Sequence, residues 1–122
     1  MPRSRASAKA AGTRHETLLV NYLSAVLDDD RIERRAKNGA LDRGDIASVR
    51  AHGQRLVIEA KDYGGRYDVG TWLREAETER VNDGALAGVV IAKRRGTTDP
   101  GDQVVIMTTR DLVALISGTR PR

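Results

Sequence analysis

The chain has 122 residues, of which 39% are hydrophobic and 31% are charged, so we expect one globular domain with a single core rather than a disordered chain. It contains no cysteine, no phenylalanine, one tryptophan and three tyrosines, which excludes disulfides and thiolate zinc sites and argues against an aromatic platform for stacked bases. The net charge is +4, and the only histidines, His15 and His52, have no metal-binding spacing, so any metal would have oxygen ligands and would be magnesium or manganese.

The positive charge is concentrated at the two ends of the chain. Four cations precede the first acid, Glu16, and two more lie within the last three residues, which leaves the body between them at −2. We expect residues 1–11 to form a flexible basic arm, residues 12–118 a single domain and residues 119–122 a basic tail. The arm either makes non-specific phosphate contacts with nucleic acid or only aids solubility. No apolar stretch follows the first cations and no segment is apolar enough to cross a membrane, so an intracellular protein without membrane contact is expected.

The first predicted element is a helix from about Thr13 to Leu27, because apolar residues recur there at helical spacing. Thr13 and Glu16 have the form of a capping box, so Glu16 is a candidate capping carboxylate and His15 is expected in the first helical turn. Three consecutive acids, residues 28–30, end the helix, and we expect them to be solvated rather than to bind a metal.

Three predicted strands follow, at about residues 31–37, 45–50 and 55–61. The turn at residues 51–54 separates the last two strands, which we expect to pair as an antiparallel hairpin with His52 in the turn. In such a hairpin, position 45 lies beside positions 59 and 60.

Asp45 and Glu59 should therefore converge at one end of the sheet, and Lys61 should share the face of Glu59, because strand side chains alternate. We expect Leu56, Ile58 and Ala60 to face the core from the opposite side. Two carboxylates and an amine are costly to bury unpaired, but the carboxylates can hold a hard divalent cation and the lysine can stabilise developing negative charge.

A glycine-containing loop at residues 62–66 leads to a second predicted helix over residues 69–81, with Asp68 as its N-cap and Gly84 after its end. Tyr63 and Tyr67 flank the loop and are expected to be half-buried or to contact substrate. The predicted buried stripe of the helix consists of Val69, Trp72, Leu73 and Ala76.

Glu75 and Glu79 lie one turn apart on the second helix. We interpret them as a solvated acidic face paired with Arg74 and Arg80. The alternative is that they orient Lys61 or a metal-bound water.

Residues 87–93 are the most apolar run and the expected central strand. A further strand at residues 103–108 and a short helix at residues 110–116, capped by Thr109, complete the chain. Two basic clusters are expected to bind phosphates. Arg34, Arg35 and Lys37 belong to the first strand, whereas Lys93, Arg94 and Arg95 lie at the end of the apolar strand, where cations add nothing to packing.

The pattern of Asp45 followed by Glu59-Ala60-Lys61 resembles the PD-(D/E)XK nuclease superfamily, with Gly44-Asp45 in place of its Pro-Asp pair. The order helix, three strands, helix, strand is similar to the core of that superfamily, and the resemblance extends from about Gly12 to Ile116. By overall similarity the chain looks closest to Holliday junction resolvase-like nucleases of actinobacteria and their phages. The resemblance implies an α/β, restriction-endonuclease-like fold, in which a mixed central sheet of about five strands is flanked by helices.

The resemblance also implies an activity, a magnesium- or manganese-dependent DNA endonuclease that resolves four-way junctions. The metal would be held by Asp45, Glu59, the Ala60 carbonyl and Glu16, the last because resolvases of this superfamily carry a glutamate on the first helix. Lys61 would position water or stabilise the transition state.

A junction has two symmetric cleavage points, so a homodimer is expected. We also expect the protein to act in the cytoplasm of a bacterial or phage-infected cell and to need no small-molecule cofactor. The alternatives are flap, nicking or exonuclease activity on the same fold, a non-catalytic DNA-binding recombination accessory, and a plain α/β interaction module.

Overall fold

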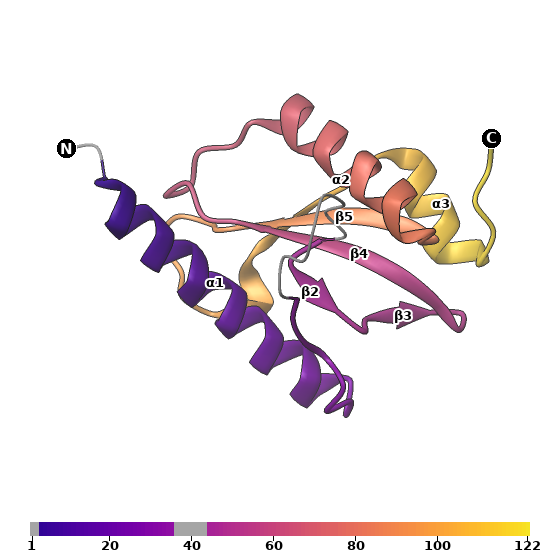
Figure 1. Cartoon of the computed structure of the whole chain (residues 1–122), viewed down its shortest axis with the longest axis horizontal. Coiled ribbons are helices and arrows are strands. Elements are labelled where there is room, and N and C mark those ends of the chain that lie inside the picture. The colour runs from indigo at the N-terminus through magenta and orange to yellow at the C-terminus, as the bar shows by residue number, and fades with distance from the viewer. Residues whose placement is uncertain (1–2, 36–43) are drawn as a thin grey trace.

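The computed structural model describes residues 3–35 and 44–122 (Figure 1). Its elements, in chain order, are α1 (Arg5–Val26), β1 (Glu33–Arg34), β2 (Ile46–Ala47), β3 (Arg50–Ala51), β4 (Gln54–Lys61), α2 (Val69–Asp83), β5 (Ala87–Ala92), the short 3-10 helix η1 (Pro100–Asp102), β6 (Val104–Ile106) and α3 (Thr109–Ser117). The expected α/β class, with a mixed sheet flanked by helices, is confirmed. No helix in the described ranges is long and apolar enough to span a membrane.

The sheet has the strand order β1-β2-β4-β5-β6, and β3 also pairs with β4. Only β4 and β5 run parallel, and α2 forms the crossover that a parallel pair requires. All six residues of β5 are buried, which confirms that the most apolar run is a central strand.

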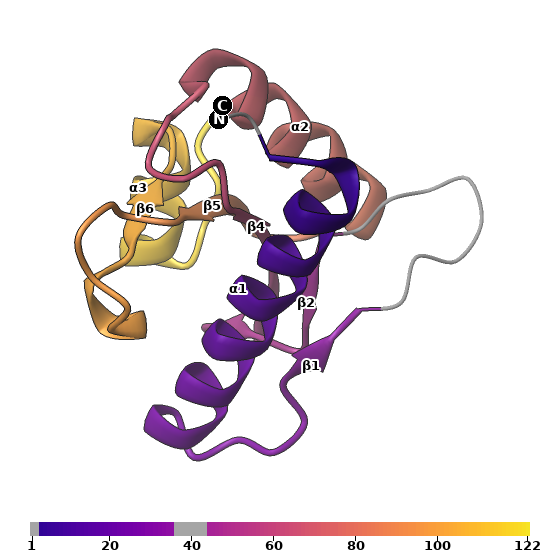
Figure 2. The ribbon, with the colours of Figure 1, turned by 90° about the vertical axis from the view of Figure 1, so that its left-hand side faces the viewer.

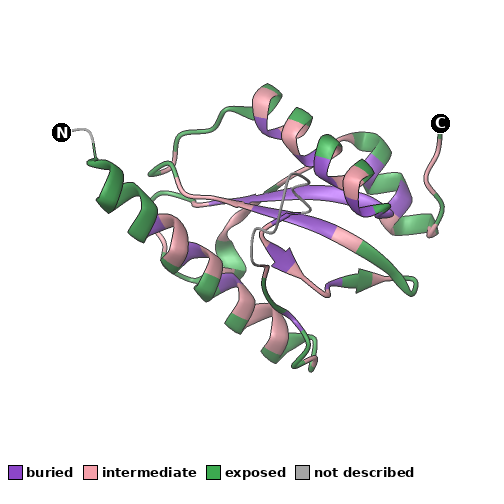
Figure 3. Ribbon diagram, viewed as in Figure 1, coloured by how far each residue is buried: buried purple, intermediate pink, exposed green. Residues whose placement is uncertain are grey.

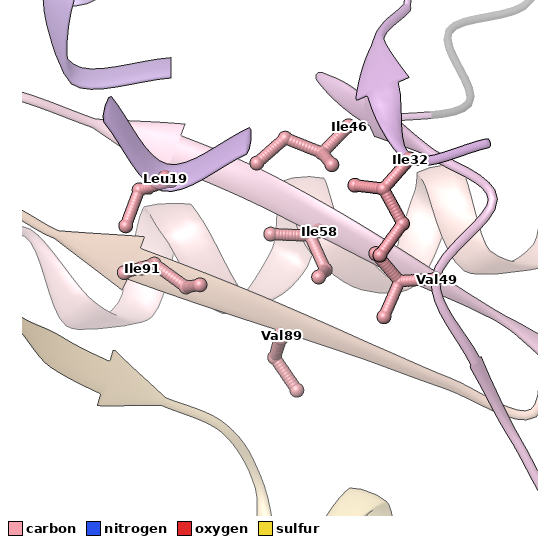
Figure 4. Close-up of a cluster of buried hydrophobic side chains, with 7 residues drawn as sticks. All are labelled: Leu19, Ile32, Ile46, Val49, Ile58, Val89 and Ile91. Carbon is pink, nitrogen blue, oxygen red and sulfur yellow. The ribbon is translucent and has the colours of Figure 1, made fainter. Parts of the chain in front are cut away.

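Helices cover both faces of the sheet, with α1 on one side and α2 on the other (Figures 1 and 2). Leu19 of α1 packs in one core cluster with alternate residues of β4 and β5, among them Ile58 and Ile91 (Figure 4). Trp72 and Ala76 of α2 pack in a second cluster with the intervening β5 residues Val90 and Ala92. Both β4 and β5 are therefore buried on two faces over much of their length (Figure 3).

The first helix begins eight residues earlier than predicted. Ser4 caps it by accepting a hydrogen bond from the Ser7 amide, and Ala11 is already buried. The expectation that residues 1–11 form a flexible arm is thus wrong for residues 5–11, because alanine, arginine and lysine, which dominate this segment, are strong helix formers. The Thr13–Glu16 capping box is also wrong, since both residues lie in the helix interior.

The second predicted strand is split in two. Ser48 has a φ of 73°, which interrupts the extended backbone between β2 and β3. His52 lies in the hairpin turn as predicted, with a φ of 54°. The last helix is capped by Thr108 rather than Thr109, because the Thr108 side chain accepts a hydrogen bond from the Asp111 amide.

The ends of α2 agree only in part with prediction. Gly84 ends the helix in the left-handed conformation, with a φ of 62°. Asp68 occupies the N-cap position, but its side chain makes no capping hydrogen bond within the described residues. The helix runs to Asp83, two residues beyond the predicted end.

We predict that Gly88→Ala destabilises the protein by about 1–3 kcal/mol, because α2 lies too close to β5 for a methyl group. A Cβ at position 88 would lie 2.8 Å from the Ala76 carbonyl oxygen. Urea unfolding measures the effect. Gly12→Ala is the matched control, since a Cβ there meets nothing within 4 Å, and alanine in a helix interior should stabilise by roughly 0.5–1 kcal/mol. Equal shifts in the same direction for the two variants would contradict this packing.

Candidate functional site

The register of the β2–β4 hairpin brings Asp45 next to the end of β4. Ile46 pairs with Ile58, and the Asp45 amide donates to the Ile58 carbonyl oxygen over 2.9 Å. The Asp45 carboxylate then accepts a hydrogen bond from the Ala60 amide, with a distance of 2.8 Å to Oδ2. The predicted placement of position 45 beside positions 59 and 60 is confirmed, and the backbone of β4 fixes the orientation of this carboxylate.

A cavity of about 670 Å³ brings together all of the predicted catalytic and metal-binding residues. Its lining includes Glu16 from α1, Asp45 from the start of the hairpin, and Glu59, Ala60 and Lys61 from the end of β4. Residues separated by up to 45 positions in the sequence therefore share one space. The rest of the lining consists of Arg3, Ala8, Gly12, Asp62, Tyr63 and Arg66.

Glu16 reaches the cavity from the interior of α1. Its Oε2 accepts a hydrogen bond from Nε of Arg34 over 2.9 Å. Because the two side chains form an ion pair, Arg34 neutralises the glutamate instead of lying open to a phosphate. Glu16 is thus a carboxylate held at the cavity rather than a helix cap.

Glu59 is buried, with 4% of its surface exposed. Burial, a hydrogen bond with the Glu79 carboxyl group and the nearby charge of Asp45 raise the pKa of Glu59 to about 11, although Lys61 opposes the shift. The raised pKa favours the neutral form of the Glu59 carboxyl group when no cation is bound.

Lys61 is held by α2. Its Nζ donates to Oε2 of Glu75 over 2.6 Å. Burial disfavours the charged form of Lys61, but the hydrogen bond and charge of Glu75 outweigh that effect, so the pKa of Lys61 is raised and the ammonium is kept charged.

These contacts correct the interpretation of Glu75 and Glu79 as a solvated face. Neither pairs with Arg74 or Arg80 in the contacts described: Arg80 binds Glu77, and Arg74 donates to the hydroxyl oxygen of Thr71. The buried residues of α2 are Trp72, Ala76, Glu79 and Asp83, whereas Val69 is 47% exposed. The spacing of 72, 76, 79 and 83 is that of one helical face, and this was the available signal that Glu79 points inward.

The predicted site lies on a face of β4 that is also buried, although only the opposite face was expected to contact the core. Val57 and Ile58, which point to opposite faces of β4, are both buried. The face that carries Glu59 and Lys61 is thus covered by α2, because α2 crosses between the two parallel strands.

The oxygen atoms at the cavity suit a hard divalent cation, but by themselves they do not complete its coordination shell. Among the described residues, Oε1 of Glu59 is buried and has no hydrogen-bond partner. Asp45, Glu59 and the Ala60 carbonyl offer oxygen alone, which matches the preference of magnesium and manganese. In the described part of the chain, no three histidine, cysteine, aspartate or glutamate side chains are grouped closely enough to form a metal site by themselves. A cation here would need the Glu59 proton to leave, and water or substrate oxygens to complete its shell.

The predicted DNA-binding residues are dispersed. The Arg35 side chain is 24% exposed and lies 3.8 Å from the Asp83 carboxylate, which Arg55 also contacts. Arg35 therefore forms an ion pair within the protein. Lys37 lies outside the described residues. The Lys93 Nζ donates to the carbonyl oxygens of its own loop, at Arg94 and Thr97. Arg94 and Arg95 are exposed at the surface.

Two aromatic residues of the loop after β4 pack on α2. The rings of Tyr63 and Tyr67 lie 5.3 and 6.3 Å from the Trp72 ring, between centroids. Both tyrosines remain about half exposed, and Tyr63 also lines the cavity. The expected half-buried position is confirmed, while substrate contact stays a prediction.

His15 is not in the first helical turn. It is buried in the middle of α1, where its Nε2 donates to the Ile91 carbonyl oxygen over 3.0 Å. The contact joins α1 to the central strand β5, so His15 has a structural role next to the cavity.

A comparison of the chain with protein families, with curated proteins and with solved structures finds no match.

Proposed function

We propose that the protein is a metal-dependent DNA endonuclease that hydrolyses phosphodiester bonds, with four-way junctions as its substrate. The observation that carries the proposal is the shared cavity of Glu16, Asp45, Glu59, Ala60 and Lys61. These carboxylates and the Ala60 carbonyl offer oxygen atoms that can bind a cation, next to an ammonium group held in place. Such a set suits the hydrolysis of a phosphodiester, whereas in a hydrophobic core it would be costly to bury.

In this mechanism Asp45, Glu59 and the Ala60 carbonyl would hold Mg²⁺ or Mn²⁺, and Glu16 would complete the set directly or through water. The bound cation supplies charge stabilisation at the scissile phosphate and a more acidic water. Hydrolysis forms a bond between a water oxygen and phosphorus and breaks one phosphorus–oxygen bond. The attacking water gives up a proton to solvent and the leaving deoxyribose oxygen takes one up, so that the products are a phosphomonoester and an alcohol. Negative charge then grows on the phosphoryl oxygens, and the Lys61 ammonium, kept charged by Glu75, stabilises it.

The test is a cleavage assay on matched four-way, flap, duplex and single-stranded DNA, with Mg²⁺ and with a chelator. We expect cleavage only with the cation and fastest on the four-way substrate. Cleavage fastest on flaps or ends would assign the flap or exonuclease alternative to the same site. Cleavage of none of them, with Mg²⁺ or Mn²⁺, would reject the nuclease proposal.

A junction presents two symmetric scissile phosphates, whereas the described chain has one such cavity. We therefore propose a two-fold homodimer as the active form. Sedimentation with and without a four-way junction measures the stoichiometry, and one protomer per cleaved junction would contradict it.

A non-catalytic DNA-binding accessory is the second candidate. What favours it is the buried position of Glu59 beside Glu79, because the raised pKa of Glu59 favours a neutral carboxyl group that needs no cation. Calorimetric titration with Mg²⁺ separates the two candidates. The nuclease proposal predicts binding with proton release, whereas the accessory predicts no site.

We predict that Glu75→Gln lowers the cleavage rate about tenfold and leaves DNA affinity nearly unchanged, because the amide keeps the hydrogen bond to Lys61 but not the charge. Single-turnover kinetics with saturating DNA give the rate separately from binding. Glu77→Gln is the matched control on the same helix, since Glu77 pairs with Arg80 and Arg120 instead. If both variants lose the same amount of activity, Glu75 only supports the helix.

A further inference from the structure

Two arginines line the cavity together with its acids, and we call the cations at the cavity its basic rim. Arg3 and Arg66 belong to the cavity lining, and they come from separate segments, one before α1 and one in the loop after β4. Neither belongs to the basic clusters that the sequence suggests as DNA contacts. Acidic and basic side chains around one cavity are the combination that admits a phosphate together with a divalent cation.

The first turns of α1 carry two more cations on the helix face that borders the cavity, although neither is among its lining residues. Ala8, Gly12 and Glu16 line the cavity at intervals of four residues, which defines one face of the helix. Arg5 precedes Ala8 by three residues and Lys9 precedes Gly12 by three, so both belong to that face. The first turn of α1 contains no acidic residue.

The start of α1 is tethered rather than free. The Arg3 guanidinium binds Asp62 twice, at 2.8 Å to Oδ1 and at 3.0 Å to the carbonyl oxygen. The Gly64 amide donates to the same carboxylate oxygen, and the Arg95 guanidinium lies 3.4 Å from the Gly64 carbonyl oxygen. The loop after β4 thus joins the beginning of α1 to the basic loop after β5, as the left-hand side of Figure 1 shows.

Arg5, Lys9 and Arg66 differ from Arg34 and Arg35 in being exposed and in forming no ion pair among the described residues, a property that they share with Arg94 and Arg95. None of the ion pairs formed by the described residues includes Arg5, Lys9 or Arg66, and all three are exposed. Arg34 and Arg35, by contrast, are paired with Glu16 and Asp83. A phosphate gains most from a cation that no carboxylate already neutralises.

We infer that Arg5, Lys9 and Arg66 bind the DNA phosphates next to the scissile one, with Arg3 holding the helix in place through Asp62. This inference rests on the proposed nuclease function and gives its DNA a path along the first turns of α1. The segment that looks like a flexible arm in the sequence is then a rigid part of the binding surface, able to respond to the shape of the substrate.

The experiment measures the affinity of the full chain for a four-way junction and a linear duplex in a chelator, over a range of salt. We expect Arg66→Ala to lower the slope of log affinity against log salt by about one, and the variant that combines it with Arg5→Ala and Lys9→Ala to lower it by about three. Arg66→Lys should restore the slope, because it keeps the charge. Arg110→Ala, an exposed arginine on α3, is the control and should leave the slope unchanged.

The outcomes separate this inference from the nuclease proposal. No DNA binding by the wild-type protein would reject the proposed function itself. Wild-type binding and cleavage, together with an unchanged slope for the combined variant, would overturn the inference and leave the function standing. Circular dichroism shows whether the α1 substitutions unfold the protein. If they do, the salt slope of Arg66→Ala alone tests the inference, because Arg66 is exposed in a loop.

Discussion

Asp45→Asn should reduce cleavage of a four-way junction in Mg²⁺ by at least about a thousandfold, which corresponds to roughly 4 kcal/mol in the activation barrier. The substitution removes one of the charges that would hold the cation. The fold should survive it, because the asparagine side-chain oxygen can still accept the hydrogen bond from the Ala60 amide. DNA affinity should be unchanged or higher, since one negative charge leaves the vicinity of the phosphate.

The measurement is single-turnover cleavage together with DNA binding and Mg²⁺ calorimetry. Asp102→Asn is the matched control, because Asp102 is an exposed acid in η1 and does not line the cavity. A normal cleavage rate for Asp45→Asn, or an equal loss of activity for Asp102→Asn, would show that Asp45 has no part in the catalytic site.

Glu59→Gln should abolish cleavage and at the same time stabilise the metal-free protein at neutral and alkaline pH. Burial first, then the hydrogen bond with Glu79 and the charge of Asp45, raises the pKa of Glu59 from its usual value near 4.5 to about 11 in the folded state. Between these values the folded state keeps a proton that the unfolded state has released. The free energy of unfolding therefore falls as the pH rises through this window.

Glutamine has no proton to lose, so this pH dependence disappears in the variant, and its amide can donate to Glu79 in place of the carboxyl proton. We expect the variant to be more stable by at least about 1 kcal/mol at pH 8, a rise of roughly 3–6 °C in Tm, and to differ little from wild type below pH 4.5. Thermal unfolding in a chelator from pH 4 to pH 9 measures both effects.

Glu33→Gln serves as the control, because Glu33 is exposed on β1 and its loss should leave the pH profile unchanged. Parallel pH profiles for wild type and Glu59→Gln would mean that Glu59 is ionised in the folded protein. A stabilised but inactive variant would instead show that the buried carboxyl group is retained for function at a cost in stability.

Local pattern in the sequence determined the order of elements and the hairpin that aligns Asp45 with Glu59. Both depend on short-range information: apolar periodicity marks each strand and helix, and the turn at His52-Gly53 sets the register. The burial of β5 could likewise be predicted, because its six residues are small or apolar throughout. Helix boundaries were less accessible, and α1 starts at Arg5 because an alanine-rich basic segment is helical once Ser4 caps it and Arg3 is tethered.

Tertiary structure alone decided which charges meet. Helical spacing indicates that Glu79 faces inward, but it does not say which charges Glu75 and Glu79 meet; only the packing of α2 on β4 makes them the partners of Lys61 and Glu59. Arg34 is paired with Glu16 in the fold, whereas Arg66 is left exposed beside the cavity. Pairing of charges depends on distances of a few ångströms between elements far apart in the chain, and the spacing of residues along a single element carries no such information.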